Sequence, residues 1–214
     1  MSPGAGTLRL RERIEHRLRD TRPGGDPLAA IAAQLPTGQA EELRRRLPAA
    51  PMRAAVMVPV VERPAGLTVL LTLRASHLKA HAGQVSFPGG RIEATDAGPW
   101  QAALREAREE IGLAPDRARL AGYLRDHFVL TGYLITPAVA IVQPDFELVL
   151  DRTEVDDAFE VPLEFVLDPA NRVPRRIDYG GHAFTTWDLP WQGRMIWGAT
   201  AAMLLNLAAT LEDE

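Results

Sequence analysis

The chain has 214 residues, 46% of them hydrophobic, which is enough to bury a core of ordinary size within one domain. Its formal net charge of −4 excludes a global basic field that would recruit nucleic acid. The absence of cysteine excludes disulfides, and no apolar run approaches the roughly 18 residues of a membrane span. The N-terminus also lacks the apolar block of a secretory signal, so we expect a cytoplasmic protein without membrane or nucleic-acid partners.

The first 50 residues are predicted to form a helical segment that precedes the main domain. Helices are expected over residues 7–20, 28–34 and 38–46. In the first of them, Leu10, Ile14 and Leu18 recur every fourth residue, which is typical of one apolar helix face. We therefore predict an N-terminal helical extension over 1–50 and one domain over 51–214. The extension can dock on the core or contribute to a homodimer contact, and the sequence leaves both open.

Segments with the sequence pattern of β-strands follow the extension, and two long predicted helices are interspersed among them. Strands are predicted over residues 54–61, 67–74, 83–90, 118–130 and 133–142, a strand running into a short helix over 154–169, and a hairpin over 175–189. Turns are expected at residues 62–66, Thr131–Gly132 and Gly180–Gly181, and the strand within 83–90 is expected to end in a turn at Pro88–Gly90. The helices are predicted over 98–113 and 194–213, and Pro99 and Gly112 suit the two ends of the first. This pattern favours an α/β (α+β) class, with a mixed β-sheet sandwiched between helices.

The predicted helix over 98–113 places three carboxylates on one face. Glu106, Glu109 and Glu110 stand at i, i+3 and i+4, a spacing at which like charges cost a few tenths of a kcal/mol per pair. Leu104, Ala107 and Ile111 form the expected core-facing stripe beside them. Either the acidic face is solvated, or a cation neutralises it. The turn FPGG shortly before the helix allows close backbone approach to a ligand and favours the cation.

The stretch GGRIEATDAGPWQAALREAREEIGL, Gly89–Leu113, resembles the Nudix box, the signature of hydrolases of nucleoside diphosphates linked to another moiety. That pattern is Gly, five residues, Glu, seven residues, then Arg-Glu-aliphatic-any-Glu-Glu-any-Gly-aliphatic. Every position from Arg105 to Leu113 fits, with the small Ala107 in the first aliphatic place. Asp96 replaces the first Glu, and eight residues rather than seven separate it from Arg105.

A second motif precedes the box. The stretch LLTLRASHLKAHAGQVSFPGG, Leu70–Gly90, resembles the motif that marks the coenzyme A pyrophosphatase branch of the Nudix hydrolases. Lys79 fills its basic position, where Arg is usual, and Gly83 fills its glycine position. Members of that branch tolerate an Asp and a slightly longer loop in the box. The two resemblances together imply a Nudix fold.

The resemblance implies roles for the acidic residues. Glu106 and Glu110 become the principal ligands of Mg²⁺ or Mn²⁺, Glu109 joins them, and the Gly90 carbonyl can complete the site. Arg105 is expected to orient a carboxylate, although a surface ion pair would explain its position equally well. Glu154 is the candidate for an additional ligand or the general base, against the alternative of an ordinary acid at the start of a strand. Asp156 and Asp157 are weaker candidates for that role.

The implied substrate is a small molecule with several phosphates. Coenzyme A carries a 3′-phosphate besides its pyrophosphate, and Arg74, His77, Lys79 and His81 precede the box where they could meet those phosphates. We therefore expect hydrolysis of coenzyme A or its thioesters to 4′-phosphopantetheine, or its acyl form, and adenosine 3′,5′-bisphosphate. The alternatives are a Nudix hydrolase of ADP-ribose, NADH or another conjugate, and a catalytically weak nucleotide-binding regulatory module.

Overall fold

The computed structural model describes residues 5–33, 35, 38–46, 50–129, 132–179 and 181–212. Six helices and eleven strands lie in this part of the chain. The helices are α1 (Ala5–Leu18), α2 (Ala29–Ala32), α3 (Gln39–Arg46), α4 (Pro99–Ile111), α5 (Leu163–Leu167) and α6 (Gly198–Leu211). Two short 3₁₀ turns, Pro115–Arg117 and Pro169–Asn171, link other elements.

The main sheet is mixed and has eight strands, with the path β3-β2-β1-β7-β5. Its strands are β1 (Met52–Arg63), β2 (Gly66–Arg74), β3 (Val85–Ser86), β4 (Gly89–Arg91), β5 (Ala118–Tyr123), β6 (His127–Val129), β7 (Tyr133–Val142) and β8 (Val155–Pro162). β1 and β7 run parallel at the centre, and the other pairs are antiparallel. Parallel neighbours need a long connection, and α4 lies within the connection between these two strands.

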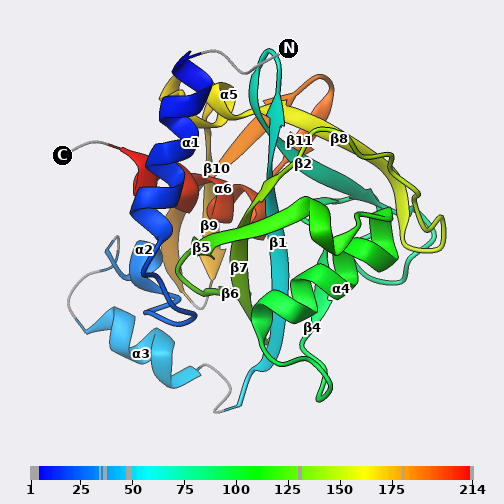
Figure 1. The fold of residues 1–214 in the computed structure, drawn as a ribbon. Coiled ribbons are helices and arrows are strands. Elements are labelled where there is room, and N and C mark those ends of the chain that lie inside the picture. Colours follow the sequence, from blue (N-terminus) through cyan, green and yellow to red (C-terminus); the bar gives the residue numbers. More distant parts are fainter. Residues whose placement is uncertain are drawn as a thin grey trace.

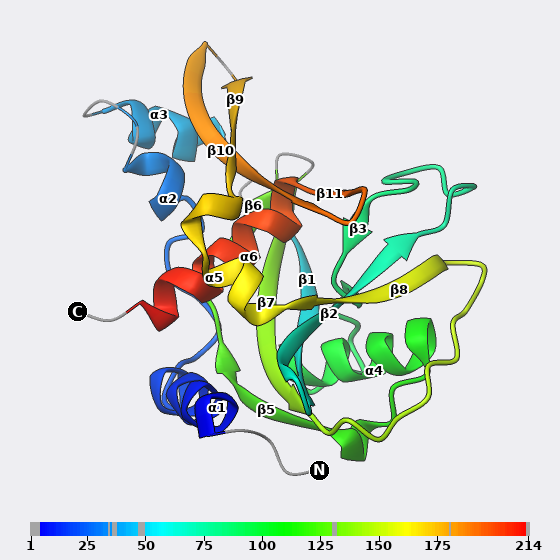
Figure 2. The same ribbon diagram turned by 90° about the horizontal axis from the view of Figure 1, so that it is seen from above.

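Helices cover both faces of the sheet, as the sequence predicted (Figures 1 and 2). On one face α4 packs through small side chains, Ala102, Ala103 and Ala107, against β1 and its neighbours. On the other face a larger apolar cluster joins α1 and α6 to the sheet, with Ile14 and Leu18 of α1 almost fully buried. The N-terminal helix is therefore docked on the core, while the homodimer contact stays a prediction.

The predicted hairpins form, with adjusted bounds. β1 and β2 meet with Arg63 opposite Gly66, inside the expected turn. A second sheet, order β11-β10-β9, is built by β9 (Val173–Tyr179), β10 (His182–Trp191) and β11 (Arg194–Ile196). Thr131 and Gly180 of the two other predicted turns lie outside the described residues, as do Gln34 and Asp213 of predicted helices.

Three predicted elements are wrong in extent. The segment over 83–90 is divided between β3 and β4, because Phe87 and Pro88 leave the first pairing before β4 joins β1. The long strand over 118–130 is two strands, since the chain leaves β7 after Tyr123 and rejoins it at His127. The last helix begins at Gly198 and not at Arg194, because residues 194–196 pair with β10 instead.

No helix in the described part of the chain has the length and apolarity needed to cross a membrane.

Candidate active site

Helix α4 carries the predicted acidic face and has clear start and stop signals. Pro99 occupies its first turn, and Gly112 ends it in the left-handed conformation at φ 70°. The buried side of the helix consists of Ala102, Ala103, Ala107, Glu110 and Ile111. The expected stripe is therefore rotated: Leu104 is only partly buried, and Glu110 faces the sheet.

Glu110 is a buried acid at the centre of the site. Glu110 is only 4% exposed, and its Oε2 accepts a 3.2 Å hydrogen bond from the Gly89 N–H. The pKa of its carboxyl is raised to about 8, mainly by burial and also by the neighbouring charges of Glu106 and Glu154. The protein thus supplies less positive charge than an ionised Glu110 requires, and a bound cation would correct this.

Glu106 lies against the glycine turn that precedes the helix. A Cβ atom at Gly90 would stand 2.3 Å from Oε1 of Glu106, so only glycine lets this carboxylate approach the turn. Burial raises the pKa of Glu106, while Arg105 opposes that shift. Two inward carboxylates and the backbone of one turn are therefore gathered at the same place.

Arg105 joins the turn, the loop and the helix through its guanidinium. It donates to Asp96 Oδ2 at 2.9 Å, to Glu106 Oε1 at 2.8 Å and to Glu109 Oε2 at 3.2 Å. It also donates to the Arg91 carbonyl at 3.0 Å. A planar fork with several donors suits this role better than a lysine would.

The Asp in the front half of the box has a structural partner. The side chain of Asp96 is 6% exposed, binds Arg105 and accepts the Glu93 N–H at 2.8 Å. The Arg105 guanidinium holds the pKa of Asp96 below its usual range. This pairing was not predicted from the sequence. Its one sign in the sequence is that Asp96 is acidic, like the Glu that it replaces in the Nudix box, although the loop is one residue longer.

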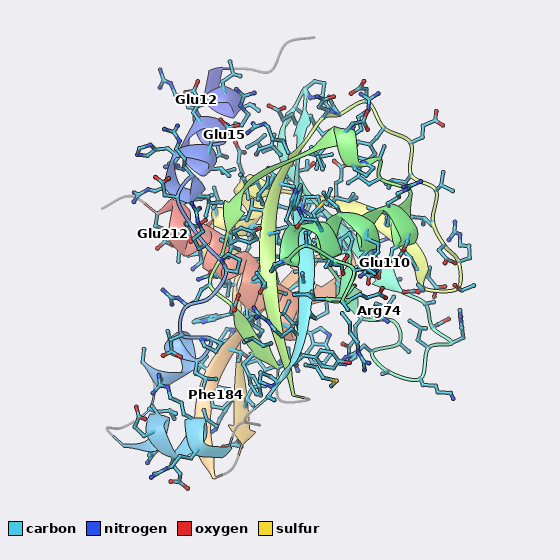
Figure 3. The ribbon with its side chains drawn as sticks, turned by 60° about the horizontal axis from the view of Figure 1, so that its bottom comes forward. Glu12, Glu15, Arg74, Glu110, Phe184 and Glu212 are labelled. Atoms are coloured by element: carbon cyan, nitrogen blue, oxygen red, sulfur yellow. The ribbon has the colours of Figure 1, made fainter. Side chains whose placement is uncertain are left out.

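Arg74, at the end of β2, and Glu154, just before β8, act electrostatically on the acids of α4. Arg74 ends β2 on the side of the molecule that carries Glu110 (Figure 3), and its charge lowers the pKa of Glu110. Its Nε is buried without a hydrogen-bond partner among the described residues. Glu154 immediately precedes β8, is exposed, and acts electrostatically on both Glu106 and Glu110. The structure therefore brings together one arginine and three acids from distant parts of the sequence.

The other predicted phosphate-binding residues lie on the exposed loop after Arg74. Lys79 is exposed, whereas the two histidines already have partners. His77 Nε2 is 3.1 Å from the Thr153 carbonyl oxygen, and His81 Nδ1 is 2.9 Å from Gln84 Oε1. His127 lies elsewhere, on β6, and burial lowers its pKa to about 4.

The weaker base candidates have separate tasks. Asp156 Oδ2 accepts the Ser76 N–H at 2.8 Å, and Asp157 pairs with Arg194 at 2.6 Å. Of the candidates for the base, Glu154 is the one whose charge reaches the helix acids.

A divalent cation fits these residues only as a partly hydrated ion. Among the described residues, no three His, Asp or Glu side chains converge as a ready metal cage. Glu109 is 59% exposed and pairs with Arg105, so its role as a ligand stays a prediction. Glu106, Glu110 and the Gly90 backbone offer hard oxygen donors, and Mg²⁺ keeps several waters and binds through one or two carboxylates. The donor set therefore suits Mg²⁺ or Mn²⁺.

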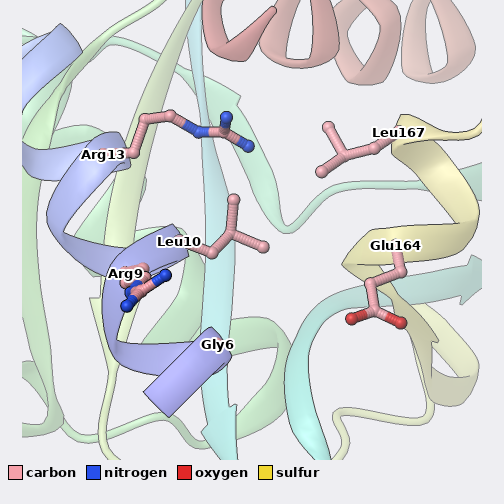
Figure 4. Close-up of a pocket in the computed structure, with 6 residues that line it drawn as sticks. All are labelled: Gly6, Arg9, Leu10, Arg13, Glu164 and Leu167. Carbon is pink, nitrogen blue, oxygen red and sulfur yellow. The ribbon is translucent and has the colours of Figure 1, made fainter.

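A pocket of about 380 Å³ lies away from these acids, between α1 and α5 (Figure 4). It is lined by Gly6, Arg9, Leu10, Arg13, Glu164 and Leu167. Both helices pack on the face of the sheet opposite α4, so this pocket shares no residue with the acidic site. The negative charge of Glu164 also offsets the positive charge of Arg9 and Arg13, which makes the pocket a poor site for an anion.

Comparison with known proteins identifies the family of the domain. The NUDIX domain family matches residues 51–179. The chain is 41% identical over 157 residues to the uncharacterized Nudix hydrolase NudL of Escherichia coli (strain K12), covering 73% of this chain and 81% of NudL. NudL of Enterobacter sp. (strain 638) gives the same values.

Solved structures with related folds share less sequence. RenU, a Nudix hydrolase from M. smegmatis, is 24% identical with a TM-score of 0.46, covering 53% of this chain and 71% of that one. The MutT Nudix hydrolase from Burkholderia pseudomallei is 20% identical with a TM-score of 0.46, covering 73% of this chain and 98% of that one. On the domain match and the NudL identity, the chain belongs to the Nudix family and is a Nudix hydrolase, a pyrophosphohydrolase.

Proposed function

We propose that this Nudix hydrolase cleaves the pyrophosphate bond of coenzyme A or its thioesters in the presence of Mg²⁺ or Mn²⁺. The products are 4′-phosphopantetheine, or its acyl form, and adenosine 3′,5′-bisphosphate. The observation that carries the proposal is the position of Arg74. Its charge acts on buried Glu110, its Nε has no hydrogen-bond partner among the described residues, and the loop that bears Lys79 and His81 follows it directly.

The charge distribution supports a substrate with more than one phosphate group. Arg74 can neutralise a pyrophosphate oxygen next to the carboxylates, where a guanidinium fork matches phosphate geometry. Lys79 and His81 stand further along the same exposed loop, where they can meet the 3′-phosphate. A substrate without that phosphate gains nothing from the distal cations, so the loop is expected to favour coenzyme A over dephospho-coenzyme A.

The acids have distinct tasks in the proposed reaction. Glu106, Glu110 and the Gly90 carbonyl would hold the cation, and Arg105 fixes Glu106 by a 2.8 Å hydrogen bond. When bound, such a cation lowers the pKa of a coordinated water and neutralises charge on phosphoryl oxygens. Glu154 remains exposed beside them and would accept the proton of the attacking water. Its alternative role is that of an additional ligand.

A substrate panel tests the proposal directly. Initial rates with coenzyme A, dephospho-coenzyme A, ADP-ribose and NADH are measured with Mg²⁺, with Mn²⁺ and with a chelator. We expect metal-dependent turnover with the highest kcat/KM for coenzyme A. Equal or better turnover of ADP-ribose or NADH would overturn the assigned specificity. Binding of nucleotide without metal-dependent turnover would instead indicate the regulatory module.

The Glu110→Gln variant tests the assigned chemistry. The amide keeps the size of the side chain but loses the negative charge that would face the cation. We expect kcat to fall by about 100-fold or more. Mutating even a residue that only hydrogen-bonds to a metal ligand lowers metal affinity or activity by about 10–100-fold. The circular dichroism spectrum should be unchanged. A rate equal to that of the wild type would exclude Glu110 from the metal site.

A further inference from the structure

Direct hydrogen bonds join the loop after β2 to the segment before β8 and to the start of that strand. Three contacts link them: Ala75 N–H to the Glu154 carbonyl at 2.8 Å, Ser76 N–H to Asp156 Oδ2 at 2.8 Å, and His77 Nε2 to the Thr153 carbonyl at 3.1 Å. The first segment carries the cations of the proposed phosphate-binding loop, and the second carries Glu154. The two therefore form one hydrogen-bonded unit.

The same unit is anchored to helix α4. The Asp151 N–H donates to the Glu110 carbonyl at 2.9 Å, and the Glu154 N–H donates to the Asp151 carbonyl at 3.0 Å. Oδ1 of Asp151 also accepts the N–H and hydroxyl of Thr153, at 2.9 and 2.7 Å. A continuous path of hydrogen bonds thus runs from the backbone of Glu110 through residues 151–154 to the loop.

Asp156 owes its position to an irregularity in the sheet. Asp157 pairs with Leu73 and Val155 pairs with Arg74, so Asp156 is the extra residue of a β-bulge. A bulge turns a side chain away from the regular ladder direction and is frequent beside active sites. Here it presents the carboxylate to the N–H of Ser76, and Arg152 donates to the Asp156 carbonyl.

We propose that Asp156 is a positioning residue that holds the 75–84 loop and Glu154 in a fixed relation, so that phosphate recognition and proton acceptance are coupled. The role assigned to Glu154 rests on the proposed function, whereas the coupling of the two segments rests on the hydrogen bonds alone. Asp156 acts through the Ser76 amide and needs no contact with the substrate. Ser76 supplies only its backbone, so the side chain that can be tested is Asp156.

Hydrogen exchange of the full chain, without metal or substrate, tests the coupling. The Asp156→Ala variant removes the acceptor, and Asp156→Asn keeps one oxygen in its place. We expect exchange to rise about fivefold or more in peptides spanning residues 70–86 and 147–158 of the alanine variant, with α4 unchanged. The asparagine variant should remain close to the wild type.

Asp157→Ala is the matched control. It removes the neighbouring carboxylate, whose partner is Arg194 and not the loop. We expect no change of exchange over residues 70–86 in this variant. Unchanged exchange in Asp156→Ala over either segment, or an equal rise in Asp157→Ala, would overturn the coupling.

Steady-state kinetics test the consequence for catalysis. For coenzyme A, Asp156→Ala should raise KM and lower kcat together, reducing kcat/KM by about 10–100-fold, as for other partners that orient active-site groups. Asp156→Asn should restore most of the loss. The rise in KM should be smaller for dephospho-coenzyme A, which lacks the 3′-phosphate. A lower melting temperature with unchanged kinetic constants would leave Asp156 a purely structural role and contradict the proposal.

The two hypotheses can fail separately. If the wild type does not hydrolyse coenzyme A, the proposed substrate is wrong, and the exchange experiment still decides whether Asp156 joins the two segments.

Discussion

Glu110 is the most deeply buried of the three glutamates of α4, Glu106 is largely buried, and Glu109 faces solvent. The spacing of Glu106, Glu109 and Glu110 predicted a shared face, and the structure divides that face by burial. Glu110 is 4% exposed, whereas the side chain of Glu109 is 59% exposed. The residue types were readable from the sequence. Their different burial was not, because it depends on how closely the alanines of α4 let the helix approach the sheet.

Burial of Glu110 predicts a pH dependence of the metal-free protein. Its pKa is about 8 when folded against an ordinary 4.5, so the folded chain binds more protons between these values. The free energy of unfolding should therefore fall as pH rises through this range, on the order of a few kcal/mol in total. The raised pKa of Glu106 acts in the same direction.

Urea denaturation at pH 5 and pH 8 in a chelator measures this dependence. The Glu110→Gln variant cannot ionise at this position, so its unfolding midpoint should change less between the two pH values. Addition of Mg²⁺ to the wild type at pH 8 should recover stability, because the cation binds only the folded state. A midpoint equally sensitive to pH in both proteins would show that Glu110 is not the responsible group.

At the scale of elements, the close approach of α1 to β5 depends on Gly122. A Cβ atom there would stand 2.1 Å from the carbonyl oxygen of Leu18 and 2.5 Å from Oγ1 of Thr21. That hydroxyl donates to the Leu18 carbonyl at 2.7 Å and accepts the Tyr123 N–H at 2.7 Å. The end of α1 and the residue Thr21 that follows it are therefore fixed to the end of β5.

Gly122→Ala should displace this end of the helix. We expect a loss of stability on the order of 2 kcal/mol or more, since overpacking adds to the strain of φ +154°. Gly66→Ala is the control, because Gly66 has φ +141° with nothing within 4 Å of its Cβ position. Urea midpoints compare the two variants. Equal losses would show that backbone strain alone, and not the contact with α1, determines the effect.

The active-site elements were predicted unevenly. Helix α4 was found with both of its ends, because Pro99 and Gly112 are local signals. The bulge at Asp156 left no such signal, since it arises from pairing between β2 and β8, about 80 residues apart in the sequence. The same reason explains why residues 194–196 were assigned to the last helix: their apolar pattern suits a helix, and only pairing with β10 makes them a strand.

At the scale of the whole molecule, the N-terminal helix shares a core with the rest of the chain. Ile14 and Leu18 belong to the same apolar cluster as Leu204, Leu207 and Leu211 of α6. The division into an extension over 1–50 and a domain over 51–214 remains a prediction. The shared cluster indicates that α1 and the sheet unfold together.

Leu18→Ala tests this expectation. Leu18 is 1% exposed, so its truncation should cost about 2–5 kcal/mol. Unfolding should still follow one transition, and kcat should be retained, because the site lies on the other face of the sheet. Leu8→Ala on the same helix is the control: Leu8 is 36% exposed and should change stability by about 0.5 kcal/mol or less. Two separate transitions, or a stability unchanged in Leu18→Ala, would show that α1 is independent.

The sequence by itself determined the family and the acids of α4, because these residues and their spacing lie within one short segment of the chain. It also placed Arg105 and Glu154 among the candidates. Only the tertiary structure decided which acids are buried, that Asp96 serves Arg105, and that Asp156 joins two segments. Those relations come from strand pairing and helix packing between residues far apart in the chain, and local patterns do not contain them.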